Sequence, residues 1–257
     1  MAALAMVREG ELVPCAVSAE VFDAVLHGRV DAAVLPIENS LHGSVAEHYD
    51  LLFENAVRID AEYQLRIRHN LIAMPGVKLE YVKHVISHPV ALSQCRKYLS
   101  AMKGVSVMPF YDTAGSVKHV MSHGLRDTAG VAPELAAKEY GAAVLAVGIE
   151  DHAENFTRFH LLRREGDALP DTADANKMSV AFVVEHRPGT LVRALQGLAD
   201  AGVDLTKIES RPVPGTPWEY VFYVDFKFGG AEAAEKALAA LRAESRLVKE
   251  LGRYAAA

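Results

Sequence analysis

The pattern of apolar residues changes at one place in the chain, and this change constrains the fold most strongly. Before an acidic, turn-rich segment at residues 166–175, short apolar stretches alternate with stretches of helical periodicity. After it, the predicted elements follow the order strand, helix, strand, strand, helix, strand. The first pattern is typical of an α/β domain with a mainly parallel sheet, and the second of a ferredoxin-like βαββαβ unit. We therefore expect two domains of different architecture, joined by a linker at residues 166–175.

Composition excludes several classes of protein. The chain has 257 residues, of which 51% are hydrophobic and 23% charged, as in an ordinary globular protein of two domains. Its net charge of −6 argues against a nucleic-acid partner, and no apolar run approaches the roughly 20 residues of a membrane helix. Two cysteines are too few for a disulfide framework. With a start that lacks the pattern of a signal peptide, these features predict a cytoplasmic protein.

Small polar residues gather where predicted strands of the first domain meet the following helices. They are Asn39 with Ser40, Ser87 with His88, and Asp112 with Thr113 and Ser116. Free backbone N–H groups at a helix start favour anions, and open α/β sheets bind ligands at such junctions. The same residue types are also the preferred helix caps. Each junction taken alone favours capping, and an anionic small molecule is the alternative.

Other local patterns favour structure over chemistry. Ser44 and Glu47 have the spacing of a capping box. His119 and His123 have the spacing of a helical metal pair, but no third ligand is near, so a solvated helix face is favoured and no metal site is predicted. Cys95 falls on an apolar helix face and is expected to be a buried structural thiol.

Several motifs occur together in one order. They are Pro-Ile-Glu-Asn-Ser at residues 36–40, Ser-His-Pro at 87–89 with Gln94 and Cys95, Asp-Thr-Ala-Gly-Ser at 112–116, Asn-Phe-Thr-Arg-Phe at 155–159, Gly-Thr-Leu-Val at 189–192 and Glu-Ser-Arg-Pro at 209–212. On spacing alone, residues 155–159 are an ordinary loop and residues 209–212 a strand that ends in a turn. Together, from about Ala3 to Tyr254, the motifs resemble the prephenate dehydratase family with a C-terminal ACT domain.

The resemblance implies a division of the chain. A catalytic domain at residues 1–165 would have two lobes like those of periplasmic binding proteins, with the cleft between them. The lobes would comprise about residues 1–71 with 148–165, and residues 72–147. Residues 176–257 would form the ACT regulatory domain, which fits the βαββαβ pattern. The family opens with a strand and a glycine-containing turn, and this chain has Ala2-Ala3-Leu4 in their place, so we expect the opening motif to be missing.

The implied activity is that of a carbon–oxygen lyase. It removes carbon dioxide and the ring hydroxyl from prephenate, forming phenylpyruvate for phenylalanine synthesis, and it needs no cofactor. Thr157 matches the family's proton donor. Arg158 either faces a substrate carboxylate or braces the loop. The positions that match substrate-binding residues of the family are Asn39, Ser40, Ser87, Gln94, Thr113, Ser116, Asn155 and Arg158.

The ACT resemblance implies L-phenylalanine as an allosteric effector and a homodimer or homotetramer. The implied effector site comprises Gly189, Thr190, Leu191, Val192, Glu209, Ser210, Arg211 and Pro212. Two other functions stay open. One is an arogenate dehydratase, which acts on the aminated relative of prephenate, and the other is a catalytically impaired phenylalanine-binding regulatory protein.

Overall fold

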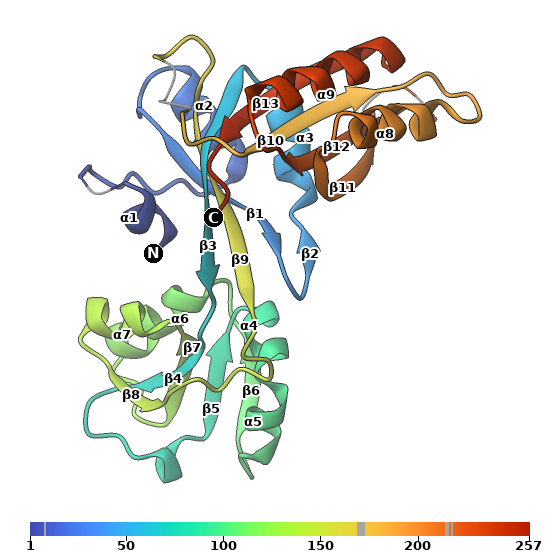
Figure 1. Ribbon diagram of the computed structural model, residues 1–257. Coiled ribbons are helices and arrows are strands. Elements are labelled where there is room, and N and C mark those ends of the chain that lie inside the picture. The colour runs from blue at the N-terminus through green and yellow to red at the C-terminus, as the bar shows by residue number, and fades with distance from the viewer. Residues whose placement is uncertain (8, 169–172, 214–215, 217) are drawn as a thin grey trace. The chain divides into compact units, whose positions relative to one another are not determined.

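The computed structural model describes residues 1–7, 9–168, 173–213, 216 and 218–257 (Figure 1). The chain forms two compact units, one comprising Met1–Leu65 with Thr157–Ala257 and the other Arg66–Phe156. The crossings predicted from the sequence, near Leu71 and Val147, both lie inside the second unit, which begins at Arg66 and ends at Phe156. Part of the predicted linker, residues 169–172, lies outside the described residues. The first unit thus contains two sheets, one before the linker and one after it.

The N-terminal part of the first unit is a four-stranded sheet with the order β2-β1-β9-β3. Its elements are α1 (Ala2–Met6), α2 (Ser18–Leu26), β1 (Ala33–Asn39), β2 (Gly43–Ser44), α3 (Ala46–Glu54), β3 (Val57–Arg66) and β9 (Phe156–Arg164). Strand β1 pairs antiparallel with β9, which places Asn39 opposite Thr157. This pairing joins two of the sequence motifs, which are far apart along the chain.

The C-terminal domain has the predicted βαββαβ order. Its elements are β10 (Lys177–Val183), α8 (Thr190–Asp200), β11 (Asp204–Pro212), β12 (Tyr220–Lys227), α9 (Ala231–Glu244) and β13 (Leu247–Tyr254). The sheet is antiparallel with the order β11-β12-β10-β13, so the ferredoxin-like prediction is confirmed. Phe182, Phe226 and Leu238 lie in the core under the two helices. The opposite face of the sheet, including Val221 and Tyr223, shares a second core with the N-terminal sheet.

The second unit is a five-stranded sheet with the order β6-β5-β7-β4-β8. Its elements are β4 (Asn70–Ala73), η1 (Leu79–Tyr81), β5 (His84–Ser87), α4 (Pro89–Gln94), α5 (Arg96–Ala101), β6 (Ser106–Pro109), α6 (Thr113–Ser122), β7 (Thr128–Ala132), α7 (Glu134–Tyr140) and β8 (Ala143–Ala146). Cys95 is fully buried in its core, and burial raises the pKa of the thiol to about 12. The prediction of a structural thiol is therefore confirmed.

The α/β class is confirmed, but the prediction of a mainly parallel sheet for the residues before the linker is wrong. Only β5 with β6 and β5 with β7 pair in parallel among the strand pairs described, whereas β1 with β9 and β4 with its neighbours are antiparallel. Parallel neighbours need a helical crossover, which connects β5, β6 and β7, whereas β9 enters the first sheet on return from the second unit. Among the described residues, no helix has the length and apolarity needed to cross a membrane.

Candidate functional site

Asn39 and Thr157 form a hydrogen-bonded pair at the end of β1. The Asn39 side-chain carbonyl accepts hydrogen bonds from the backbone N–H groups of Leu41 and His42, at 3.0 and 3.1 Å. These two donors fix the orientation of the amide, because only its oxygen can accept them. The Asn39 amide nitrogen then donates to the Thr157 hydroxyl at 3.0 Å.

This hydrogen bond determines what the Thr157 hydroxyl can do. A hydroxyl oxygen that accepts from an amide keeps its own proton for donation elsewhere. Hydrogen bonds in a chain polarise one another, so acceptance from Asn39 strengthens the donor capacity of Thr157. The side chain is partly exposed at the strand end. The arrangement suits a neutral group that donates a hydrogen bond or a proton to a small molecule.

Arg158 points to the opposite face of β9 and is buried. Its guanidinium contacts three carboxylates, those of Asp225 at 2.6 Å, Glu38 at 3.0 Å and Glu62 at 3.3 Å. Burial opposes the charge of Arg158, but Asp225, Tyr49 and Tyr254 together outweigh burial and raise the pKa of Arg158 above its ordinary value. Two roles are predicted for Arg158, contact with a substrate carboxylate and bracing of the loop. Contacts with three carboxylates of the protein favour bracing.

Ser44 has a different role from the one predicted. Helix α3 begins at Ala46 with Val45 as its N-cap and has no side-chain cap. The Ser44 hydroxyl instead donates to Glu209 at 2.8 Å and accepts from Lys207 at 2.9 Å. The capping-box prediction is therefore wrong, because two charged groups of β11 compete successfully for the hydroxyl.

The predicted residues of the second unit lie at its strand ends and helix starts. The buried Ser87 hydroxyl donates to the Val131 carbonyl at 2.6 Å, and Ser116 donates to the Thr113 carbonyl at 2.6 Å. At the start of α6, the Asp112 carboxylate accepts from the Gly115 N–H at 2.6 Å, so the capping interpretation holds there. These contacts order the junction between sheet and helix.

Gln94 and Asn155 are also buried in the second unit. The Gln94 side-chain oxygen lies 2.7 Å from Nε2 of His69, a partner that the sequence motifs do not indicate. The Asn155 backbone carbonyl accepts from the Ile67 N–H at 2.7 Å, where the chain leaves β3. The Gln94 side chain and the Asn155 backbone are therefore held at defined places within this unit.

His160 is a buried histidine on the same strand as Thr157. Neither ring nitrogen has a hydrogen-bond partner among the described residues, and the ring packs 5.8 Å from that of Tyr254. Burial lowers the pKa of His160 to about 3, helped by the positive charges of Arg158, Lys177 and Lys207 and opposed by Asp225. The folded protein therefore holds this imidazole neutral at physiological pH.

This neutral histidine predicts a loss of stability in acid. Unfolded His160 takes up a proton near pH 6.5 and folded His160 only near pH 3, so the unfolded state binds more protons between these values. The free energy of unfolding should therefore decrease as the pH is lowered through this window, and His160 should contribute up to about 1.4 kcal/mol per pH unit to this decrease. His160→Leu should flatten the slope, measured by urea unfolding at several pH values between 4 and 7. Equal slopes for the variant and the wild type would show that another group dominates.

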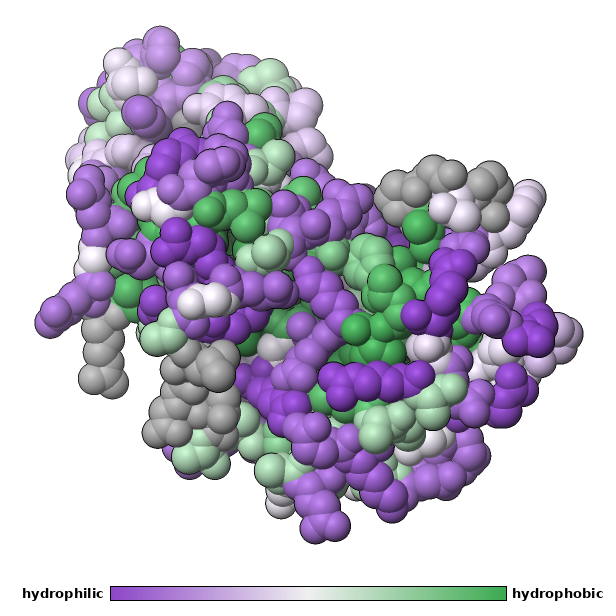
Figure 2. All heavy atoms as spheres, turned by 90° about the horizontal axis from the view of Figure 1, so that it is seen from above, coloured by the Kyte–Doolittle hydropathy of each residue, from purple (hydrophilic) through white to green (hydrophobic). Residues whose placement is uncertain are grey.

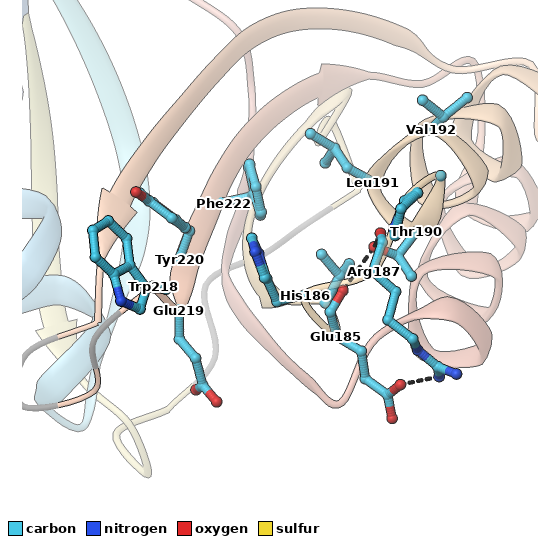
Figure 3. A pocket seen from close by; sticks show the side chains of 13 residues that line it. Glu185, His186, Arg187, Thr190, Leu191, Val192, Trp218, Glu219, Tyr220 and Phe222 are labelled. Carbon is cyan, nitrogen blue, oxygen red and sulfur yellow. Dashed lines mark hydrogen bonds and ion pairs between the residues drawn. The ribbon is translucent and has the colours of Figure 1, made fainter.

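A pocket of about 350 Å³ lies in the C-terminal domain at the start of α8 (Figure 3). Residues from the loop before α8 line one side, together with Thr190, Leu191 and Val192. Tyr220 and Phe222 of β12, with Trp218 just before this strand, line the other side, as Figure 3 shows. Gly189, the N-cap of α8, has a left-handed φ of 83°, which favours glycine at this position. The pocket combines aromatic walls with the N-terminus of an 11-residue helix.

Part of the predicted effector site lines this pocket and part does not. Residues 189–192 line it, as does the unpredicted aromatic set of β12, whose alternating pattern is visible in the sequence. Ser210 and Pro212 lie on β11, opposite Phe222 and Tyr220. Glu209 and Arg211 instead contact the N-terminal part of the unit, where Arg211 pairs with Asp50 at 2.7 Å. Residues 209–212 therefore do not line the pocket, but they lie on the strand next to β12, which forms part of its wall.

The C-terminal domain also exposes apolar side chains. They are Val192, Leu205, Ile208, Trp218, Tyr220 and Leu247. Figure 2 shows one face of the molecule, on which hydrophobic residues lie among hydrophilic ones.

Two family models match the chain. The model described as prephenate dehydratase matches residues 1–167, and the model described as ACT domain matches residues 178–245. The chain belongs to the prephenate dehydratase family. The C-terminal βαββαβ unit is therefore an ACT domain, and the motifs around Asn39 and Thr157 fall within the prephenate dehydratase match.

Relatives and solved structures agree with the family. "Arogenate dehydratase/prephenate dehydratase 2, chloroplastic" from Arabidopsis thaliana is 42% identical over 95% of this chain and 66% of its own length. A prephenate dehydratase from Arthrobacter aurescens, solved in complex with L-Phe, is 34% identical with a TM-score of 0.85, over 95% of this chain and 81% of its own. A solved structure named GqqA, described as a novel type of quorum quenching acylases, is 32% identical with a TM-score of 0.89, over 100% of this chain and 92% of its own. The chain spans about two thirds of the length of the curated relatives it matches.

Proposed function

We propose that this chain is a prephenate dehydratase in which Thr157 donates the proton to the leaving hydroxyl. The observation that carries the proposal is the hydrogen bond from Asn39 to Thr157, which leaves the threonine proton available to a substrate. Expulsion of hydroxide from a ring is the difficult step, and a positioned donor at the leaving oxygen lowers its barrier. The family match at residues 1–167 supports the same reaction.

The bond changes balance without a cofactor. The ring C–O bond breaks as the oxygen takes the Thr157 proton and leaves as water. The bond between the ring and its carboxylate also breaks. Carbon dioxide leaves, and the electron pair of the broken bond stays in the ring and completes the aromatic system. The Thr157 oxygen then regains a proton from solvent. Neutral donors suit this chemistry, since a cation clamped on the departing carboxylate would stabilise the ground state.

We further propose that the residues at the family's substrate-binding positions contact the substrate. They are Asn39, Ser40, Ser87, Gln94, Thr113, Ser116 and Asn155. These residues match the family's motifs, and most are neutral hydrogen-bond donors of the kind that preorganises an anionic transition state. Arg158 is better described as a bracing residue, because its guanidinium contacts three carboxylates.

Arogenate is the second candidate substrate. The curated relatives from Arabidopsis thaliana and Petunia hybrida include proteins named arogenate dehydratase. The two substrates differ in the side chain that carries a keto or an amino group, while the reacting ring is the same. Side-by-side measurement of kcat/KM for prephenate and arogenate decides between them. We expect prephenate to be preferred, and a higher kcat/KM for arogenate would assign the alternative.

The similarity to GqqA makes acylase activity a third assay for the same preparation. Acyl transfer needs an activated nucleophile beside a base. The Thr157 hydroxyl is bonded to an amide, which is no base, and the Cys95 thiol is buried with a raised pKa. Neither Thr157 nor Cys95 is thus an activated nucleophile, and we expect dehydratase turnover to exceed acyl-amide hydrolysis.

We propose that the pocket at α8 binds L-phenylalanine as an effector. Its aromatic wall suits the phenyl ring, and the N-terminus of α8 suits the carboxylate. The relative from Arthrobacter aurescens was solved with L-Phe, which supports this ligand class. The exposed apolar residues of the ACT domain support its pairing in a homodimer or homotetramer. The cytoplasmic location remains a prediction, and several plant relatives are named chloroplastic.

Arg211 provides a test of the effector proposal. Arg211→Met removes the ion pair that Arg211, on the strand beside the pocket wall, makes with Asp50. It should raise the phenylalanine concentration that gives half of the response by about tenfold, the effect of losing one charge-assisted contact next to the pocket. Basal turnover should change less than the response does. Arg253→Met, which removes ion pairs with Glu250 of the same strand, β13, and with Glu235 of α9, is the matched control. Loss of turnover with an unchanged phenylalanine response would contradict the role assigned to Arg211.

A further inference from the structure

A cluster of charged side chains joins the catalytic strands to the ACT domain. The first sheet contributes Glu38, Glu62 and Arg158, and the ACT domain contributes Lys177, Lys207 and Asp225. The cluster thus holds three acids and three bases. All but Glu38 have side chains exposed by 10% or less. Charges this deeply buried are stable only when they are paired.

The pairing runs from one domain to the other. Asp225 holds Arg158 at 2.6 Å, and Lys207 holds Glu38 at 3.0 Å. Glu38 and Arg158 also contact each other at 3.0 Å, which closes the chain of contacts across β1 and β9. The Ser179 hydroxyl donates to the second oxygen of Asp225, and Lys177 contacts Glu62 at 2.8 Å. Every carboxylate therefore has a cation, and the ACT domain supplies a charged partner to each of Glu38, Glu62 and Arg158.

The cluster lies directly beside the proposed catalytic pair. Glu38 precedes Asn39 on β1, and Arg158 follows Thr157 on β9. The strand register places Glu38 opposite Arg158 and Asn39 opposite Thr157. A shift of Glu38 or Arg158 would therefore move the neighbouring residue of the catalytic pair. A misplacement of about 1 Å in a reacting group is enough to slow catalysis about 100-fold.

We propose that Lys207 and Asp225 of the ACT domain are positioning residues for the dehydratase reaction, which hold Glu38 and Arg158 and thereby keep Asn39 and Thr157 aligned. This proposal rests on the proposed function of Thr157. It makes the ACT domain part of the catalytic apparatus even when no effector is bound. A movement of β11 or β12 would then displace Thr157, because Lys207 contacts Glu38 at 3.0 Å and Asp225 contacts Arg158 at 2.6 Å.

Lys207 is the sharper of the two residues to test. Lys207→Met removes the charge and keeps much of the apolar stem, and we expect it to lower kcat about tenfold to 100-fold with a smaller change in KM. Lys207→Arg keeps the charge and should restore most of kcat. Lys249→Met is the matched control. Lys249 also connects the ACT domain to the N-terminal part of the unit. It donates to the carbonyls of Leu52, Phe53 and Asn55 at the end of α3, outside the charged cluster.

A double-mutant cycle separates positioning from general stabilisation. If Lys207 acts through Glu38, Lys207→Met should have a smaller effect in a Glu38→Gln background than in the wild type. Additive effects on kcat, or equal losses in Lys207→Met and Lys249→Met, would overturn the proposal. Full activity of Lys207→Met would do the same while the proposed dehydratase function stands.

Hydrogen exchange gives a readout that does not depend on turnover. Peptides that cover residues 33–39 and 156–164 should exchange faster in Lys207→Met than in Lys249→Met, because the strand pair loses its clamp. Equal exchange in the two variants would contradict the positioning role. Absence of turnover by the wild-type chain on prephenate and on arogenate would refute the proposed function instead, and the exchange comparison would still decide whether Lys207 orders the strands.

Discussion

Thr157→Ala is expected to reduce turnover of prephenate by about 10²-fold to 10⁴-fold, the contribution typical of a positioned proton donor. The methyl group cannot donate to the leaving oxygen, and the Asn39 amide loses the acceptor it has at 3.0 Å. The fold should survive, since Thr157 lies at the partly exposed start of β9 and its removal leaves the buried cluster intact. Steady-state kinetics of phenylpyruvate formation measure the effect, and L-phenylalanine binding by calorimetry checks that the ACT domain is unaltered.

Thr157→Ser is the matched variant for this prediction. Serine keeps the hydroxyl and the hydrogen bond from Asn39, so it should retain a much larger share of kcat than alanine does. Near-normal turnover by Thr157→Ala would remove Thr157 from the mechanism. Equal losses for serine and alanine would mean that the threonine methyl group, and not its proton, matters.

Gly252→Ala is expected to destabilise the protein strongly. A Cβ at this position of β13 would lie 2.1 Å from the backbone oxygen of Ile59 on β3 and 2.8 Å from the Ile59 Cβ. Backbone atoms of a paired strand cannot move aside as a side chain does, so the two sheets of the first unit must separate. Overpacking of this kind costs about 3 kcal/mol. At about 3 °C per kcal/mol for a chain of this size, Tm should fall by about 9 °C.

Gly229→Ala supplies the control for this effect. No atom lies within 4 Å of the Cβ that it would add, and the position belongs to the same domain. Differential scanning calorimetry should therefore find a Tm close to that of the wild type for Gly229→Ala. A Tm for Gly252→Ala within a degree or two of the wild type would show that β13 does not pack against β3 as closely as the structure has it.

The sequence predicts the elements of the ACT domain well because each has its own short-range pattern. Alternation of Met178, Val180 and Phe182 predicts β10, and the spacing of Leu191, Leu195 and Leu198 predicts α8. Residues 189–192 and the β12 aromatics lie near each other because the βαββαβ topology leaves little choice. Motif order likewise predicts the family from residues that are local in the chain.

Long-range pairing is what the sequence cannot supply. Nothing in the local pattern indicates that β1 pairs antiparallel with β9, because their motifs are separated by the whole second unit. The same separation hides the partners of Arg158, all three of which lie on strands far from β9 along the chain. Ser44 illustrates the error that follows: its local spacing indicates a helix cap, while Lys207 and Glu209 hold its hydroxyl.

Release of carbon dioxide in step with an aromatic product tests the central claim most directly. The measurement uses the purified 257-residue chain with prephenate and, separately, with arogenate. We predict equal amounts of carbon dioxide and phenylpyruvate from prephenate, at a rate that L-phenylalanine changes and that Thr157→Ala lowers by about 10²-fold to 10⁴-fold. A folded chain that binds phenylalanine and releases no carbon dioxide from either substrate would contradict the account and leave a phenylalanine-binding regulatory protein.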